Sequence, residues 1–490
     1  MKRRSLHSTG GKGRRWAWGF EMSTMMTAVK NDLSGGSLAL SLARMAVDAR
    51  YDALPQEVIR KAQLHLLDTV GIALASLSQP FAAASLDGIR AAGGQGDCTV
   101  LGTGYQLAAR DAAMANGLLM HGLDFDDTHL ASIIHASVAS LPAALSLGEH
   151  LDVSWKDMLA AYVAGMETAI RIGTAVKGGL HHVGFHATGV VSHFSSAVVA
   201  GKLLGLTAGQ ISQAQGVVAS TAAGVQVFLE DGAWTKRMHP GWGALAGITA
   251  AYMVNSGFVA PTRAYEGRFG FFETHLRGME IDTEVMLAGL GSSWRMLETA
   301  IKPYPICHFS HACAEAASLL HERVAGRLNE IEEITALLPE PTLHIVAEPA
   351  GAKQNVQTDY DAKFSVQYVV AAALLRGGFG MKELLPESLS DRQIGELARQ
   401  VVCKPQLDTE FPKYFSGQVT VRLRNGDIIT EHIPVNQGAG ERQITRDGIA
   451  EKFLANAGLL VDSGKARSLL DALERAEGAS VRQVMRALAL

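Results

Sequence analysis

The sequence is poor in aromatic residues and in long apolar runs. Aromatic residues make up 6% of the 490 residues, whereas the hydrophobic fraction is 48% and alanine, leucine and glycine are abundant. Small side chains suit closely packed helices better than a sheet sandwich, so the composition favours a helical protein. No run of 18 or more apolar residues is free of charges and of glycine or proline, which argues against a membrane-spanning helix.

Cysteine is scarce, and the chain has no large excess of positive or negative charge. The four cysteines, Cys98, Cys307, Cys313 and Cys403, include no C-x-x-C pair. This excludes a disulfide framework and indicates a reducing compartment, so we expect a cytoplasmic protein. The net charge is −4 with interspersed signs. Neither a nucleic acid nor an anionic membrane is therefore expected as a partner.

The first 24 residues differ from the rest of the chain. They carry six basic residues and one acidic residue, Glu21. They lack the apolar segment of a secretory signal, and none follows the pair Arg14-Arg15 as a twin-arginine signal requires. We expect a disordered leader, or translation that starts at Met22 or Met25, with a mitochondrial presequence as the alternative.

The length and the periodicity predict two domains, the first of them helical. A chain of 490 residues is too long for one ordinary core. Apolar spacing and helix-start signals predict helices over residues 55–77, 111–121, 136–150, 155–176, 188–204, 207–223 and 242–256. Without a fixed repeat, they indicate a bundle or an orthogonal array over residues 25–296.

The pattern changes after about residue 291. Residues 330–346 and 419–423 alternate apolar and polar side chains, and Arg424-Asn425-Gly426-Asp427 between apolar runs predicts a type I′ hairpin. We predict a smaller α+β domain over residues 297–434, followed by helices over 435–490 that pack back onto the helical domain. The predicted fold class is mainly α, with a large all-helical domain and a smaller α+β domain.

The stretch from His121 to Ala144 is the first candidate site. Asp124, Asp127, Thr128 and His135 lie there among alanine, leucine and isoleucine. In a helix, Asp124, Thr128 and His135 would stand at i, i+4 and i+11, close to one stripe. A buried carboxylate beside an imidazole shifts the pKa of both groups, as acid–base catalysis requires. The alternative is a helix-capping cluster in which His135 is a core residue.

Three further groups of polar residues lie in apolar surroundings. Each contributes imidazoles or cations at a turn: His181, His182 and His186 before a helix, Lys236, Arg237 and His239 before a proline and a helix, and Lys302, Tyr304 and His308 at the junction of the two domains. A helix N-terminus attracts anions, and lysines bind carboxylates. With Asp124 and His135, these groups predict a site that clamps carboxylates and moves a proton. Each group alone is also compatible with solvated surface residues.

Metal and nucleotide sites are less consistent with the pattern. The histidines at 181, 182 and 186 have no acid or cysteine nearby and match no zinc spacing. The aspartates of residues 124–127 are similar to a magnesium motif, but the second motif and the aromatic lining of such enzymes are missing. Residues 241–247 resemble a dinucleotide loop that no predicted strand precedes. We therefore expect no metal and no cofactor.

Eight segments together resemble the MmgE/PrpD family, which includes 2-methylcitrate dehydratase, cis-aconitate decarboxylase and iminodisuccinate epimerase. The resemblance spans residues 36–480. The segments are P55-Q-E-V-I-R-K-A, L67-D-T-V-G, L123-D-F-D-D-T, G184-F-H-A-T-G, G201-K-L-L-G-L, T235-K-R-M-H-P-G, I301-K-P-Y-P-I-C-H and A362-K-F-S-V-Q-Y. The resemblance implies a large helical domain, a smaller α+β lid domain, a homodimer, and a metal-free site in the cleft between the domains.

The motifs of the family also imply which residues form the site. The implied catalytic residues are Asp124, Thr128, His135, His186, Lys236 and Lys302. We interpret the chain as a cofactor-independent lyase for a small di- or tricarboxylate, similar to 2-methylcitrate dehydratase. The lysines and His186, supported by Arg237, would hold the substrate carboxylates and stabilise the charge that forms on one of them.

The proton chemistry is assigned to the remaining polar residues. His135, tuned by Asp124, would transfer the proton, and Thr128 would orient the pair. We expect His239 in the substrate site as well, and His308 or Tyr304 to protonate a departing hydroxyl.

Three other functions remain open at this level. They are decarboxylation of cis-aconitate to itaconate, epimerisation of an amino-dicarboxylate such as iminodisuccinate, and binding without catalysis by a helical protein. Vertebrate-type cis-aconitate decarboxylases have a tyrosine near the segment that corresponds to residues 343–346, and this sequence has none there.

Overall fold

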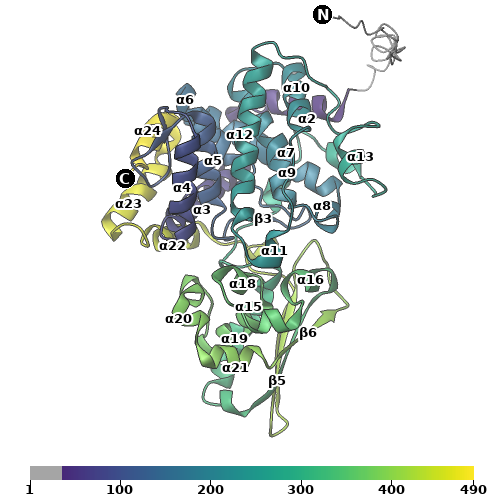
Figure 1. The fold of residues 1–490 in the computed structure, drawn as a ribbon, viewed down its shortest axis with the longest axis vertical. Coiled ribbons are helices and arrows are strands. Elements are labelled where there is room, and N and C mark those ends of the chain that lie inside the picture. Colours follow the sequence, from purple (N-terminus) through teal and green to yellow (C-terminus); the bar gives the residue numbers. More distant parts are fainter. Residues whose placement is uncertain (1–35) are drawn as a thin grey trace, which may run out of the picture. The chain divides into compact units, whose positions relative to one another are not determined.

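The computed structural model describes residues 36–490, so the predicted leader lies outside the described residues. The first part of the described chain is helical (Figure 1). Its helices are α2 (Leu38–Asp48), α3 (Gln56–Ser76), α4 (Pro80–Ala92), α5 (Ala109–Met120), α6 (Leu141–Leu151), α7 (Trp155–Ala175), α8 (Gly179–His182), α9 (Ala187–Leu203), α10 (Ala208–Val218), α11 (Phe228–Asp231), α12 (Thr235–Asn255), α13 (Phe271–His275) and α14 (Thr283–Leu287).

Short strands interrupt this helical part, and a mixed part follows it. The short strands are β1 (Cys98–Thr99), β2 (Gln106–Leu107), β3 (Thr128–His129) and β4 (Thr299–Ala300). The mixed part contains α15 (His311–Val324), β5 (Ile331–Pro339), α16 (Leu343–Val346), α17 (Ala350–Gln354), α18 (Asp359–Lys363), α19 (Val366–Arg376), α20 (Pro386–Leu389), α21 (Arg392–Ala398), β6 (Val401–Gln406), β7 (Gly417–Leu423) and β8 (Ile428–Ile433). The chain ends with α22 (Arg446–Ala457), α23 (Ser463–Glu474) and α24 (Val481–Ala487).

Two large hydrophobic cores, with a small third cluster of Phe228, Tyr360 and Phe364, agree with the predicted fold class, which is mainly α with a smaller α+β part. One core joins the helices before residue 302 with apolar residues of α22, α23 and α24. The other lies between α15, α19 and the sheet, whose strand order is β6-β5-β7-β8. In this sheet β5 and β6 run parallel, whereas β7 is antiparallel to both β5 and β8. Figure 1 shows α22 close to α3, and the two helices are in contact.

Helix α12 begins earlier than the sequence predicts, at Thr235 instead of Trp242. Pro240 therefore lies inside the helix, although a proline usually marks the first turn. Close packing accompanies this irregular start. A Cβ atom at Gly241 would lie 2.3 Å from the carbonyl oxygen of Met114 on α5, and one at Gly247 would lie 2.5 Å from Ala197 N on α9. Tertiary packing thus accounts for a helix whose start the local sequence rules place seven residues too late.

The predicted hairpin joins β7 to β8, but its turn is not type I′. Of the four described turn residues Arg424 to Asp427, Gly426 alone has a positive φ, 92°. The Gly426 amide donates to Leu423 O at 2.9 Å, which makes Arg424 and Asn425 the central residues. A type I′ turn requires positive φ at both of them, whereas a three-residue loop needs it only at the glycine that follows.

Within residues 36–490, no single helix has the length and apolar character of a membrane span; the bent pair α3 and α4 passes the same test by length and composition alone.

Candidate active site

The backbone between α5 and α6 is irregular, so the predicted helical stripe through Asp124, Thr128 and His135 is wrong. Asp124 and Ile133 have φ values of 53° and 52°, in the left-handed region that ends a helix. The predicted helix over residues 136–150 likewise begins only at Leu141. Strand β3 pairs with β4, with Thr128 opposite Ala300, and this brings the chain that continues to Lys302 next to Asp124. The positions of these side chains therefore depend on the pairing of two distant strands and not on a local helical repeat.

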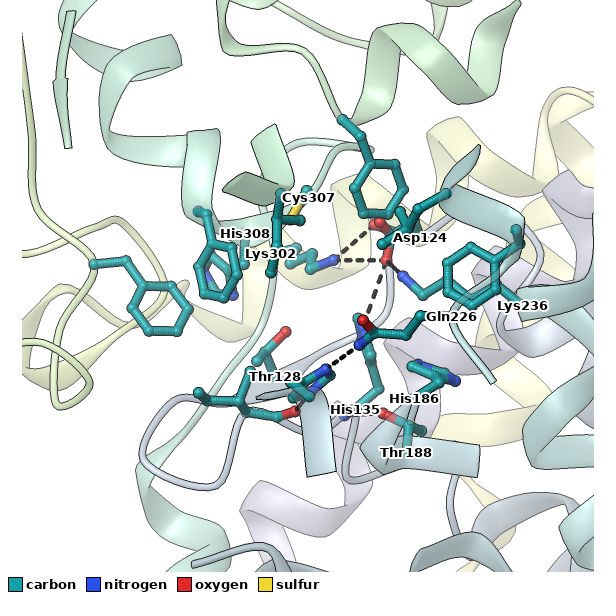
Figure 2. Close-up of a pocket in the computed structure, with 18 residues that line it drawn as sticks. Asp124, Thr128, His135, His186, Thr188, Gln226, Lys236, Lys302, Cys307 and His308 are labelled. Atoms are coloured by element: carbon teal, nitrogen blue, oxygen red, sulfur yellow. Dashed lines mark hydrogen bonds and ion pairs between the residues drawn. The ribbon is translucent and has the colours of Figure 1, made fainter. Parts of the chain in front are cut away.

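All six predicted catalytic residues line one cavity. The cavity has a volume of about 70 Å³, and the six residues are Asp124, Thr128, His135, His186, Lys236 and Lys302. The helical part supplies most of them, and the α+β part contributes Cys307, His308, Ile345 and Phe364 to the same walls. Figure 2 shows the polar side chains directed toward one another across the cavity.

Asp124 lies between two lysines. Its Oδ1 atom is 2.8 Å from Lys236 Nζ and 3.1 Å from Lys302 Nζ, and all three side chains are at least nine-tenths buried (Figure 2). Burial opposes the charge of Asp124, but the two ammonium groups hold the pKa of its carboxyl well below the usual range. Two positive charges thus share one negative charge.

His135 has one ring nitrogen fixed and the other directed at the charged group. Its Nδ1 donates to the Asp127 carbonyl at 2.9 Å, and its Nε2 lies 3.5 Å from Asp124 Oδ1. Burial, reinforced by the charge of Lys302, lowers the pKa of His135 well below its usual value. At neutral pH its Nε2 is therefore unprotonated and can accept a proton. The Asp124 carboxylate opposes this fall in pKa, and its role in tuning His135 stays a prediction.

The three aspartates of the loop have different partners. Asp126 binds His121 Nδ1 at 2.7 Å, and Asp127 binds His65 Nδ1 at 2.6 Å and the Ser137 amide at 3.1 Å. Asp124 alone lines the cavity. Asp126 and Asp127 thus bind histidines on the side of the loop away from the cavity, while Asp124, Asp126 and His135 each offer one possible metal-ligand atom within 4.8 Å of the others.

A cluster of imidazoles adjoins the cavity. The ring of His121 stacks on that of His186, with centroids 5.4 Å apart, and meets His135 edge-on at 4.7 Å. Each of the three offers one ligand atom, and these atoms lie within 4.8 Å of one another. Burial, followed by the charge of His239, lowers the pKa of His186. Three imidazoles at this spacing fit Zn²⁺, so the expected absence of a metal stays a prediction that an experiment must test.

Three residues expected in the site lie outside the cavity walls. Arg237 donates from Nε to the Gly122 carbonyl and pairs with Asp359, so it supports the loop. His239 contacts His186 Nδ1 at 3.1 Å and does not face the cavity. Tyr304 packs beside His311, and burial raises the pKa of its hydroxyl to about 12. These three were chosen for their neighbours in sequence, which does not determine the direction of a side chain.

Two other predicted residues line the cavity with different contacts from those expected. The Thr128 hydroxyl has no hydrogen-bond partner among the described residues, so the predicted orienting bond to Asp124 and His135 is absent. The Thr188 hydroxyl instead accepts from the His135 amide at 3.1 Å. His308 binds Asn436 through Nε2 at 2.9 Å, and burial lowers its pKa well below the usual value.

Sequence reasoning missed several residues of the site. Gln226 lines the cavity and donates to His181 Nδ1 at 2.6 Å, yet a lone glutamine in a loop gives no signal in sequence. His121 is the first residue of the candidate stretch from His121 to Ala144, and Thr188 follows His186 by two residues. Their positions in the sequence could therefore have suggested both as site residues. The apolar wall formed by Phe228, Ile345 and other side chains depends on contacts between distant segments.

Comparison with known proteins assigns a family to this arrangement. The profile of the MmgE/PrpD N-terminal domain matches residues 40–284, and that of the MmgE/PrpD C-terminal domain matches residues 304–477. The chain belongs to the MmgE/PrpD family. The first profile ends within the helical part and the second includes the sheet and most of the C-terminal helices.

Similar proteins in this family are named as two kinds of lyase. The chain is 25% identical to cis-aconitate decarboxylase of Aspergillus terreus, over 91% of this chain and 94% of the relative. It is 27% identical to cis-aconitate decarboxylase of Homo sapiens, over 90% and 92%. It is 25% identical to 2-methylcitrate dehydratase of Salmonella typhimurium, over 87% and 92%. The chain is about equally similar to the decarboxylases and to the dehydratase, so sequence identity does not show which of the two activities it has.

Proposed function

We propose that this member of the MmgE/PrpD family is a cofactor-independent lyase that acts on a small di- or tricarboxylate. The observation that carries the proposal is the unequal charge at the centre of the cavity, where Lys236 and Lys302 share the single carboxylate of Asp124. One positive charge is left uncompensated among side chains that are at least nine-tenths buried. Such a centre attracts a substrate carboxylate and strengthens its hydrogen bonds.

The same centre supports the loss of a proton next to a carboxylate. When that proton leaves, negative charge accumulates on the carboxylate oxygens, which the two ammonium groups stabilise in place. His135 is the base in this proposal, because its unprotonated Nε2 lies beside Asp124 in the cavity wall. The backbone amides at the start of α9, which follows His186, would bind a second carboxylate.

Decarboxylation is the second candidate reaction, because neither of the two predicted acids suits a departing hydroxyl. Dehydration needs an acid for the departing hydroxyl, and Tyr304, one of the two predicted acids, does not line the cavity. His308 does, but its lowered pKa leaves it unprotonated at neutral pH. Loss of carbon dioxide needs no acid at a hydroxyl, and the carbanion that remains would take its proton from the ammonium group of Lys236 or Lys302, both of which line the cavity.

A substrate assay tests the proposal. Purified protein is incubated with citrate, 2-methylcitrate, cis-aconitate and iminodisuccinate, and carbon dioxide release and ultraviolet absorbance are followed together. We expect turnover of at least one tricarboxylate. New absorbance without carbon dioxide identifies a dehydratase, and carbon dioxide with loss of the aconitate absorbance identifies a decarboxylase. No turnover of any of the four compounds by folded protein would refute the lyase proposal.

The same assay after overnight dialysis against EDTA tests the metal-free mechanism. We expect unchanged turnover, because the lysines supply the charge stabilisation that a metal would otherwise provide. A loss of activity that added Zn²⁺ restores would instead assign a metal to the imidazoles of His121, His135 and His186.

A further inference from the structure

Four consecutive carbonyl groups beside the cavity each accept a hydrogen bond from a different cationic side chain. The donors are Arg237 Nε to Gly122 O (2.8 Å), Lys363 Nζ to Leu123 O (2.9 Å), Lys302 Nζ to Asp124 O (2.8 Å) and Lys452 Nζ to Phe125 O (3.0 Å). The four cations come from α12, α18, the segment after β4, and α22. Segments from across residues 235–457 thus bind one loop of four residues.

The cations are buried and paired, which makes these bonds strong. Lys363 is 1% exposed and Arg237 is 2% exposed. Asp359 lies 3.2 Å from Arg237 and 3.7 Å from Lys363. Lys452 lies 2.7 Å from the fully buried carboxylate of Asp68. Hydrogen bonds from an ionised donor in such surroundings are shorter and stronger than those between neutral groups.

The bound loop has a backbone conformation that needs support. Asp124 has φ 53°, in a region that residues other than glycine seldom occupy. This conformation presents the Asp124 carboxylate to Lys236 and Lys302. A change of backbone at this residue would move the carboxylate away from both.

Lys452 binds both the loop that carries Asp124 and the segment that carries Lys302. Its ammonium group donates to the carbonyls of Phe125 and Lys302, at 3.0 Å and 2.8 Å, in addition to its pair with Asp68. The ammonium group thus makes two hydrogen bonds to backbone carbonyls and one ion pair. Lys452 therefore fixes the residue after Asp124 and also the residue whose side chain binds Asp124.

We propose that Lys363 and Lys452 are positioning residues that hold Asp124 between the two cavity lysines by binding the backbone of residues 122–125. Neither of them lines the cavity, so they act through the loop and not on the substrate. The effect on turnover rests on the proposed function, whereas the effect on the loop does not.

Hydrogen exchange measured by mass spectrometry tests the proposal without a substrate. The variants are Lys363→Met and Lys452→Met, with Lys61→Met as the matched control. Lys61 is also buried, but its Nζ binds the side chain of Gln443 at 3.0 Å and no carbonyl of the loop. We expect peptides that cover residues 121–130 to exchange about tenfold or more faster in both variants and to be unchanged in the control.

The proposal is overturned if these peptides exchange at the parent rate in both variants, or if Lys61→Met accelerates them equally. Lys452→Met leaves Asp68 alone in the interior, which can prevent folding. The double variant Asp68→Asn with Lys452→Met removes both charges and is judged by the same criterion.

A double-mutant cycle on turnover separates positioning from general stability. With whichever of cis-aconitate and 2-methylcitrate is turned over, Lys452→Met is expected to lower kcat/KM by about 10- to 100-fold in the parent protein. In the Asp124→Asn background it should change kcat/KM by no more than about twofold, because residues that act through one another are not additive. Equal fold losses in both backgrounds would contradict the proposal. Failure to turn over either substrate concerns the proposed function alone, since the exchange result stands without it.

Discussion

Replacement of His135 by alanine is expected to lower kcat by about 10²- to 10⁴-fold, with little change in KM. His135 Nε2 is the unprotonated nitrogen that faces the charged centre, whereas the carboxylate clamp does not depend on it. Steady-state kinetics on the identified substrate provide the measurement. A parent rate in folded His135→Ala protein would show that another group transfers the proton, and His308 would be the next candidate.

His321→Ala is the matched control for this variant. Both histidines are partly buried and both donate from Nδ1 to a carbonyl, in the case of His321 to Leu374 O at 2.7 Å on α19. We expect the parent kcat in the control. A loss equal to that in His135→Ala would mean that the removal of any such ring disturbs the fold.

The pH dependence of kcat/KM in the parent protein gives the same base a second signature. Burial and the charge of Lys302 lower the pKa of His135, so its imidazole stays unprotonated as the pH falls below the usual value of 6.5. The acidic limb of the profile should therefore lie below pH 6.5. A limb above this value would mean that His135 is not the titrating base.

Replacement of Asp124 by asparagine is expected to reduce the free energy of unfolding by about 3–5 kcal/mol, because two buried ammonium groups lose their carboxylate. Asparagine tolerates the left-handed backbone as aspartate does, so the change isolates the charge. Urea denaturation measures the difference. The acidic limb of kcat/KM should also move further down, since the Asp124 carboxylate raises the pKa of His135.

Asp97→Asn provides the comparison for an exposed carboxylate. Asp97 pairs with His150 at 3.2 Å, and its side chain is 59% exposed. Exposed pairs contribute less than about 1 kcal/mol, so we expect a correspondingly small change. A similar loss of stability in both variants would contradict the assignment of Asp124 as the counterion of a buried cation pair.

The main features of the site could be predicted from the sequence because lysine, aspartate and histidine rarely occur in apolar segments without a reason. Asp124, His135, His186, Lys236 and Lys302 stood out in this way, and all of them line the cavity. Long helices such as α3, α7 and α9 were also predictable, since their apolar spacing is local. The assignment of roles to these residues stays a proposal that the variants above test.

The local geometry could not be predicted. A helical stripe was expected through Asp124 and His135, whereas a left-handed residue and the pairing of β3 with β4 arrange them. Arg237 had the right neighbours in sequence, yet its side chain turns to the loop backbone. Lys452 lies 327 residues from the carbonyl that it binds, and no local pattern reports such a contact.

A crystal structure of the protein with tricarballylate tests the central claim most directly. This tricarboxylate has no hydroxyl to lose and no double bond, so it would remain unreacted in the site. We expect one carboxylate within about 3.2 Å of Lys236 Nζ or Lys302 Nζ, and the carbon chain next to His135 Nε2. Binding in the separate groove lined by Arg110, Tyr252 and Phe258, with the cavity at Asp124 left without the ligand, would contradict the account.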